Sequence, residues 1–380
     1  MTKLLPRIKP FAAALSLVCA GVMSVLVASP VHAAPDCGGP IEITRGGTYS
    51  GCYQSTDAET SAVTIATTAP VTLDRATISH KGEGITGDGH AQLTVKNSKF
   101  LALSTGSQIA DQRHIYLYKP VSLRVENNSM VDGHGILINA DWSPVSRVTV
   151  RYNTATNLGR HAADDYIQFL QLDKVVAGSA EIAWNRVTNV KGQSSVEDII
   201  SLHSSFGRDA AHPIDIHHNM LSGAYPLTGN GFGYSGGGIM VGDGGRGNHV
   251  RVHHNRIVSS ANYGVSIVGG YDNHAFSNRL ASDGRDETGA RVSATFSQGL
   301  ALWDIEESGS MTNVDQRDNV VGWVRPDGRA DWWLPACMPS GACTGNVSMP
   351  GEITAATEKA EQTAWASEIK ASRFTVGTNW

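Results

Sequence analysis

The fold of this chain is decided between Asp164 and Asn278, where a short apolar segment recurs four times. The segments read Tyr166-Ile-Gln-Phe-Leu-Gln-Leu172, Asp198-Ile-Ile-Ser-Leu-His-Ser204, Gly238-Ile-Met-Val-Gly-Asp243 and Gly264-Val-Ser-Ile-Val-Gly269. Each is followed by a loop and a second short segment that ends in asparagine. Such a unit cannot bury its own apolar face, and a repeat of about 20–50 residues indicates a solenoid whose units share one core. Because the repeat carries strands and almost no helix, it predicts a parallel β-helix.

Similar segments on both sides extend the pattern to about nine coils, in a single all-β domain that spans residues 35–343. The alternation of apolar and polar residues predicts strands with one buried face. Cys37–Tyr53 is expected to cap the first coil, and residues 344–380, helical over Thr357–Ala371, are expected to cap the last. The rule for parallel crossovers predicts a right-handed winding.

Asparagine recurs at one corner of the expected coils. Asparagine can adopt the left-handed backbone conformation and bond its equivalent in the next coil. We therefore expect a structural ladder, and not a functional site, at Asn97, Asn127, Asn153, Asn185, Asn219, Asn255 and Asn278.

The N-terminus has the pattern of a secretory signal, residues 1–34. A basic start precedes the largely apolar Phe11–Val27, and Val31-His-Ala33 is a small-residue cleavage motif, so cleavage is expected near Ala33 or Ala34. The secreted chain, periplasmic or extracellular, would have no membrane segment. Three of the 30 Lys and Arg residues lie in the signal, which leaves 27 against 35 Asp and Glu and a net charge of −8. That charge argues against nucleic-acid binding, which requires a basic surface.

Four cysteines remain after cleavage, in two close pairs. In an oxidising compartment the local pairing Cys37–Cys52 and Cys337–Cys343 is expected. Metal binding is the alternative, although neither pair has compact ligand spacing.

Acidic residues fall at matching places in the central coils. Asp164 and Asp165 precede one strand, Glu197 and Asp198 precede the next, and Asp243 follows the strand after that. Because adjacent coils lie about 4.8 Å apart, stacked carboxylates repel unless a proton, a cation or a basic group intervenes. The group therefore predicts a functional site, and the alternative is that these acids cap turns.

His203 would point outward with Glu197 if Ile200 and Leu202 point inward, and it could then act as a general base or acid. Arg208 and Arg246 are the basic residues nearest this region and could bind a uronate carboxylate through two hydrogen bonds. The Gly-rich loop Gly223–Gly237 is expected to form a sugar-stacking wall with Tyr225, Phe232 and Tyr234.

Two short stretches resemble known β-helix enzymes. Glu197-Asp-Ile-Ile-Ser-Leu-His-Ser-Ser205 is similar to the Glu-Ile-Ile-Ser-x-Lys-Ser strand of alginate-lyase and chondroitinase-B-like lyases. The resemblance implies a calcium-binding role for Asp198 and the catalytic base role for His203. Where those lyases have Arg-His-Gly in the next coil, this chain reads Gly242-Asp-Gly244.

The same coils also resemble, less closely, the polygalacturonase group of hydrolases. Glu197-Asp-Ile-Ile200 is similar to its Asp-Asp-x-Ile, and Gly236-Gly-Gly-Ile-Met-Val-Gly242 to its Gly-His-Gly-Ile-x-Ile-Gly without the histidine. The Arg-Ile-Lys of that group is absent from the next coil, which reads Val265-Ser-Ile-Val-Gly-Gly270.

The first expectation is a monomeric polysaccharide lyase that acts on a uronate-containing polymer by β-elimination. Calcium at Asp164, Asp165 or Asp198 would neutralise the uronate, His203 would remove the proton, and Arg208 or Arg246 would steady the charge. The alternatives are a glycoside hydrolase with two carboxylates from the same acidic group, including Asp243, and a non-catalytic adhesive β-helix.

Overall fold

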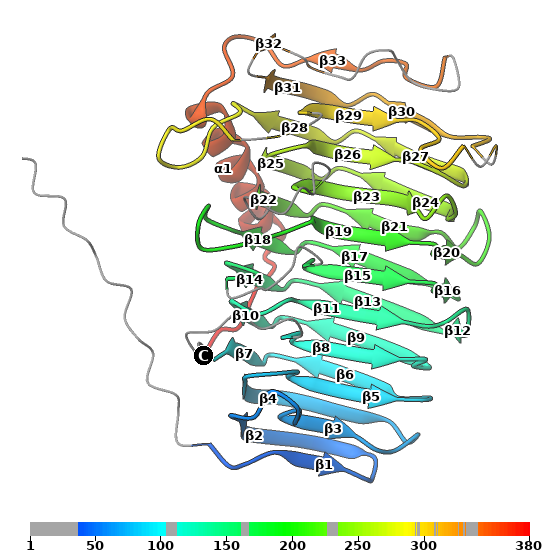
Figure 1. Cartoon of the computed structure of the whole chain (residues 1–380), viewed down its shortest axis with the longest axis vertical. Helices are drawn as coiled ribbons and strands as arrows, with labels where there is room; N and C mark the ends of the chain where they lie inside the picture. Colours follow the sequence, from blue (N-terminus) through cyan, green and yellow to red (C-terminus); the bar gives the residue numbers. More distant parts are fainter. Residues whose placement is uncertain are drawn as a thin grey trace, which may run out of the picture. The chain divides into compact units, whose positions relative to one another are not determined.

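Equivalent strands of successive coils pair in parallel along the stack, so the chain forms a parallel β-helix as predicted (Figure 1). The computed structural model describes residues 37–103, 112–160, 167–225, 235–292, 294, 297–307, 309, 311–325, 327–329, 331 and 341–380. The expected signal peptide lies outside these residues. Pro35–Trp380 belongs to one compact unit.

One face of the stack, here called the front sheet, has ten parallel strands in the described part of the chain. That is one more than the nine coils expected, because the N-terminal capping segment itself contributes the first strand. The strands are β1 (Ile41–Ile43), β3 (Val63–Ile65), β5 (Ile85–Asp88), β8 (Ile115–Tyr118), β11 (Ile136–Asn139), β15 (Leu170–Asp173), β19 (Asp198–His203), β23 (Gly237–Asp243), β26 (Tyr263–Ile267) and β29 (Gln298–Leu302).

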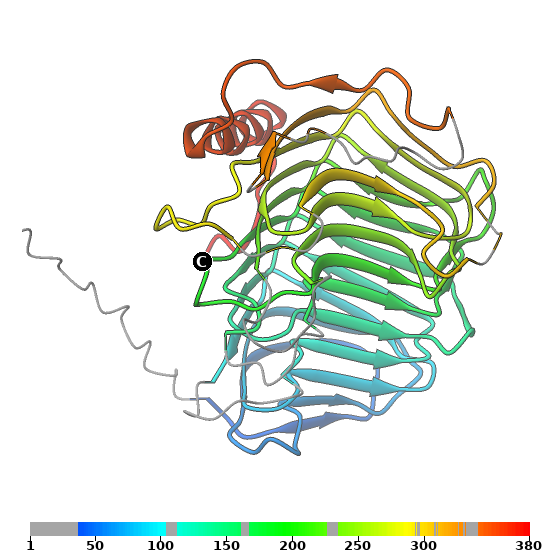
Figure 2. The same ribbon diagram turned by 45° about the horizontal axis from the view of Figure 1, so that its top comes forward.

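Two further faces complete each coil, and Figure 2 shows the chain turning from one face to the next. The second face comprises β6 (Gln92–Lys96), β9 (Ser122–Glu126), β13 (Arg147–Arg151), β17 (Ala180–Ala183), β21 (Ile214–His217), β24 (Asn248–His253), β27 (Tyr271–Phe276) and β30 (Asp315–Arg317). The third face comprises β7 (Lys99–Ala102), β10 (Ser129–Val131), β14 (Thr154–Thr156), β18 (Arg186–Thr188), β22 (Met220–Ala224), β25 (Arg256–Ser260), β28 (Arg279–Ser282) and β31 (Val320–Arg325).

The remaining strands join or extend these faces. The long strands β2 and β4 pass from the second face to the third, and the two-residue strands lie at corners or at the C-terminal end. They are β2 (Gly47–Ser55), β4 (Val71–His80), β12 (Pro144–Val145), β16 (Val176–Ala177), β20 (Phe206–Gly207), β32 (Gly328–Arg329) and β33 (Val347–Ser348).

The core consists of apolar side chains stacked coil upon coil. In the front sheet Ile136, Leu170, Ile200 and Ile239 are paired in register and are almost completely buried. Burying such a side chain contributes roughly 1.5–3 kcal/mol relative to exposing it. Burial alternates along β11 and β15, as predicted, whereas Phe169 and Ile199, just before Leu170 and Ile200, also belong to the core.

A buried asparagine ladder runs along one corner, but it begins one residue later than expected. Asn128 donates two hydrogen bonds to Oδ1 of Asn153, one from its backbone N and one from Nδ2, at 3.0 Å each. The same pair of hydrogen bonds repeats from coil to coil up to Asn346. The expected Asn97 and Asn127 instead have positive φ of 52° and 55°. The left-handed residue is thus the one before each ladder position, because the ladder side chain must point inward to reach backbone carbonyls of the core.

Histidine rings stack on the outside of the second face. His217 lies over His253 with 5.1 Å between ring centroids, and His218 lies over His254 at 5.0 Å. In both pairs the rings belong to adjacent coils, and their separation is close to the distance between coils.

The C-terminal segment departs from the expected arrangement. The stack continues past residue 343, since β33 pairs with β31. The helix expected over Thr357–Ala371 is present as α1 (Ala355–Ser372), but it lies along the third face beside β25 and β28 and not over the last coil (Figure 1). Glu361 of α1 forms ion pairs with Arg256 and Arg279, and Trp365 packs in an apolar cluster with Val258 and Ala281 of the same face.

The chain then runs back along the third face to Trp380, whose indole N–H donates to the carbonyl of Asn97 at 2.6 Å. No helix in the described residues is long and apolar enough to cross a membrane.

The predicted disulfide Cys37–Cys52 is confirmed. Cys343 is also disulfide-bonded, and its expected partner Cys337 lies outside the described residues. A disulfide is typical of a protein of an oxidising compartment.

Candidate functional site

One outward column of the front sheet brings together residues from six coils. Strand register places Asp88 beside Tyr118, then Asn139, Asp173, His203 and Asp243 in order. A second, parallel column holds Thr86, Tyr116, Leu137, Gln171, Ser201 and Met240. The titratable residues His203 and Asp243 of the sequence hypothesis therefore lie on one face, in adjacent coils.

His203 is paired with an acid that the sequence reasoning missed. Its Nδ1 lies 2.6 Å from Oδ1 of Asp173, and its side chain is 34% exposed. The hydrogen bond to Asp173 raises the pKa of His203 above its usual value, and the negative charge of Asp243 adds to this effect. With Nδ1 held by Asp173, the other ring nitrogen, Nε2, is the atom available for proton transfer.

Glycine leaves room beside that second nitrogen. A β-bulge between Leu202 and His203 sets the imidazole opposite Asp243, and the turn continues through Gly244 with φ of +74°. A Cβ at Gly244 would come within 2.8 Å of His203 Nε2. The Gly-Asp-Gly sequence, which departs from the lyase pattern, thus keeps the approach to the imidazole open.

Asp198 occupies a different environment from that expected of a calcium ligand. It is 3% exposed and accepts a hydrogen bond from the hydroxyl of Tyr263, which passes over Gly237. Burial raises the pKa of Asp198 well above its usual value, and the charge of Glu197 raises it further. In this structure one carboxyl oxygen of Asp198 is bonded to the Tyr263 hydroxyl, and the side chain faces the protein interior.

Glu197 itself is partly buried and accepts a hydrogen bond of 2.5 Å from the amide of Gln168. Asp164 and Asp165 lie outside the described residues. Among the residues that the structure describes, no group of three or more His, Cys, Asp or Glu side chains could hold a metal ion.

Three cations are relevant to this site. Lys174, which the sequence reasoning also missed, follows Asp173 and lies close enough for its charge to act on His203. Arg246 is exposed in the turn after Asp243. Arg208 lies in the loop after β20, where its guanidinium pairs with Asp209 at 3.1 Å.

The expected aromatic wall is not found at Tyr225. Its side chain is 2% exposed, and its hydroxyl donates to Glu287 at 3.1 Å in a small cavity beside α1 on the third face. Phe232 and Tyr234 lie outside the described residues.

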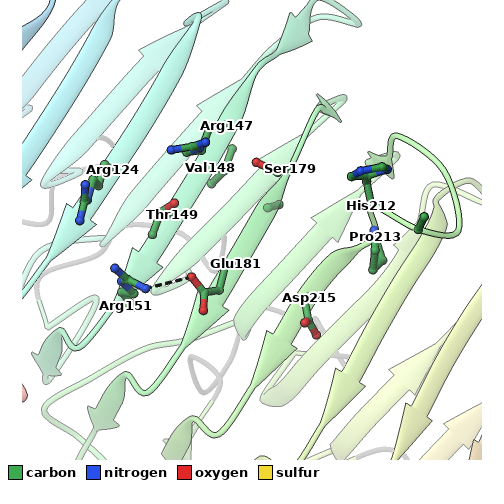
Figure 3. A pocket seen from close by; sticks show the side chains of 12 residues that line it. Arg124, Arg147, Val148, Thr149, Arg151, Ser179, Glu181, His212, Pro213 and Asp215 are labelled. Carbon is green, nitrogen blue, oxygen red and sulfur yellow. Dashed lines mark hydrogen bonds and ion pairs between the residues drawn. The ribbon is translucent and has the colours of Figure 1, made fainter. Parts of the chain in front are cut away.

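A second hollow lies on the second face and has a volume of about 470 Å³ (Figure 3). Arg124, Arg147 and Arg151 lie along one flank, and Glu181 and Asp215 along the other. Most of these charges are already neutralised, since Arg151 pairs with Glu181 at 3.3 Å and Arg124 pairs with Glu126 at 2.7 Å. The hollow therefore offers little free charge for a ligand.

Comparisons with protein-family models, with curated proteins and with solved structures each return no match for this chain.

Proposed function

We propose that this protein is an exported polysaccharide lyase that cleaves a uronate-containing polymer by β-elimination, with His203 as the base. The hydrogen bond between Asp173 and His203 is the observation that carries this proposal. An acid bonded to Nδ1 orients an imidazole and selects the tautomer that leaves Nε2 free to accept a proton. The same hydrogen bond raises the pKa of His203, which makes the neutral imidazole a stronger base.

In this reaction Nε2 of His203 accepts the proton from carbon 5 of the uronate. The electron pair of that C–H bond forms the double bond between carbons 4 and 5. The bond from carbon 4 to the glycosidic oxygen breaks, and this oxygen takes a proton from solvent. One product carries an unsaturated uronate, and the other has a new end with a free hydroxyl.

The uronate carboxylate must be neutralised for carbon 5 to lose its proton. Lys174 is the best-placed residue for this role, because its charge already acts on His203 and it follows the orienting Asp173 directly. Arg246, in the turn after Asp243, is a second cation at the same end of the strands. A cation bound by Asp164 and Asp165 is the alternative source of positive charge.

A glycoside hydrolase is the second candidate, and the pair Glu197–Asp198 supports it. Burial raises the pKa of Asp198, whereas its neighbour Glu197 is more exposed. Two adjacent carboxyl groups in different environments are typical of an acid and a base in glycoside hydrolysis. Asp198 is the weaker part of this proposal, since substrate must reach a side chain that is 3% exposed.

The test is a panel of polysaccharides assayed for the absorbance of unsaturated products and for reducing ends. A lyase produces both signals, and a hydrolase produces reducing ends alone. His203→Ala should abolish both signals, while His212→Ala is the matched control. His212 is also an exposed histidine whose Nδ1 pairs with an acid, Asp209, at 2.7 Å, but it lies on the second face. Equal loss in both variants, or none in His203→Ala, would contradict the proposal.

A further inference from the structure

We propose that the hollow formed by β3, β5 and β8 is a subsite that binds an uncharged sugar unit of the substrate, remote from the reacting uronate. This inference rests on the proposed function, and it adds a prediction of substrate class. The substrate would be a heteropolysaccharide in which neutral sugars accompany the uronates.

The hollow lies on the front sheet and has a volume of about 530 Å³, within the range of sites for small ligands. Ile65, Ala66 and Gly87 provide an apolar part of its lining, and the polar residues are Thr64, Thr86, Asp88, Tyr116 and Tyr118. An apolar surface with a few polar groups matches a pyranose ring, which has apolar C–H faces and a rim of hydroxyl groups.

Two tyrosines from one strand form the aromatic part of this hollow. Tyr116 and Tyr118 occupy successive outward positions of β8, and both are partly exposed. Tyr118 is held in place by Asp141, which accepts a hydrogen bond from its hydroxyl at 3.3 Å and pairs with Lys119 at 2.8 Å. Burial raises the pKa of Tyr116, so its hydroxyl stays protonated and can donate to a sugar oxygen. Aromatic rings held in this way bind at a low cost in conformational entropy.

Strand register connects this hollow to the proposed base. Tyr118 and His203 belong to the same outward column, with Asn139 and Asp173 between them. Three coil steps of about 4.8 Å separate them, or roughly 14 Å along the stack. A polysaccharide that lies along this column would contact both places at once.

The charges around the hollow favour a neutral sugar. Asp88 is exposed, and none of the hydrogen bonds or ion pairs found among the described residues involves its carboxylate. The nearby cations are already paired, Lys119 with Asp141 at 2.8 Å and Arg113 with Glu83 at 3.5 Å. A uronate here would meet uncompensated negative charge, whereas the hydroxyls of a neutral sugar can donate to Asp88.

Binding is tested in full-length mature protein that carries His203→Ala, so that the polymer is not cut. Mobility is measured in gels that contain hyaluronan, gellan or glucuronoxylan, which combine uronates with neutral sugars, and in gels that contain polygalacturonate or alginate. The double substitution Tyr116→Ala and Tyr118→Ala should weaken binding of a mixed polymer by about tenfold or more, since loss of an aromatic anchor commonly costs this much. Tyr271→Ala is the control, because Tyr271 is 43% exposed but lies on the second face.

Unchanged binding in the double variant would overturn the subsite, as would a loss confined to polygalacturonate and alginate, or retardation of the parent protein by none of the five polymers. The proposed function fails separately. If the protein with His203 intact binds a mixed polymer through the two tyrosines but produces no unsaturated ends, the subsite stands and the lyase proposal falls.

Discussion

Nδ1 of His203 lies 2.6 Å from Oδ1 of Asp173, a residue 30 positions earlier in the chain and one coil away in the stack. Parallel pairing of β15 with β19 brings the two side chains together on the outside of the front sheet. This pair makes His203 the strongest candidate base among the described residues, and the first prediction tests it.

Asp173→Asn should lower the pKa of His203, because the carboxylate that stabilises the imidazolium is removed. A base acts only when neutral, so activity rises with pH through the pKa of His203. The acidic limb of the kcat/KM profile should therefore move to lower pH, while the maximal rate falls because the imidazole loses its orientation. An acidic limb that stays in place would show that His203 is not the titrating base.

Lys174→Met should reduce kcat/KM for uronate polymers by about tenfold or more, since a charged hydrogen bond to the carboxylate is lost. Lys96→Met is the control, because Lys96 pairs with Asp74 at 3.4 Å and lies on the second face, away from the column. Assays with and without EDTA complete the comparison. Activity that disappears in EDTA and returns with calcium, in a protein insensitive to Lys174→Met, would assign the neutralising role to a cation at Asp164 and Asp165.

Glu358→Gln should stabilise the protein above neutral pH. Glu358 lies on the buried side of α1, and burial raises its pKa to about 7, above the unfolded value of 4.5. The contribution of Glu358 to the free energy of unfolding is therefore fully present below about pH 4.5. It is lost as the pH rises through 7, by an amount on the order of 3 kcal/mol. Urea unfolding at pH 5 and pH 8 should show this loss in the wild type and little of it in the variant. Equal losses in the two proteins would contradict the environment described for Glu358.

At acidic pH, two buried histidines should make stability fall as the pH is lowered, the opposite of the effect of Glu358. His80 and His114 are completely buried, with His80 Nε2 lying 2.8 Å from His114 Nδ1. Burial lowers the pKa of His80 from 6.5 to about 4. The contribution of neutral His80 to the free energy of unfolding is therefore fully present above pH 6.5 and is lost as the pH falls towards 4. His80→Gln should reduce that loss by roughly 3 kcal/mol between pH 7 and pH 4, measured by urea unfolding. A His80→Gln variant whose stability changes between the two pH values as much as that of the wild type would contradict this prediction.

Peptide mapping under non-reducing conditions tests the second disulfide. Fragments that join Cys337 to Cys343 are expected beside those that join Cys37 to Cys52. A fragment that joins Cys343 to either N-terminal cysteine would contradict the local pairing.

Much of the fold could be predicted because its signals are local. Alternation along each strand and the recurring asparagines depend on neighbouring residues alone, and both are present in the structure. The ladder was misplaced by one residue at Asn97 and Asn127 because a polar residue follows each of them, Ser98 and Asn128, and the doublet does not reveal which side chain points inward.

The sequence by itself thus determined the coil, the stacking of coils and the outward position of His203. The tertiary structure alone decided which residues of different coils meet. The lengths of the loops between strands set the register of the strands, and no local sequence pattern reveals that register. The sequence therefore did not show that Asp173 and Tyr118 lie in the same column as His203. The tertiary structure likewise buries the side chains of Asp198 and Tyr225, because the direction of a side chain at a strand end or in a loop depends on what packs against it.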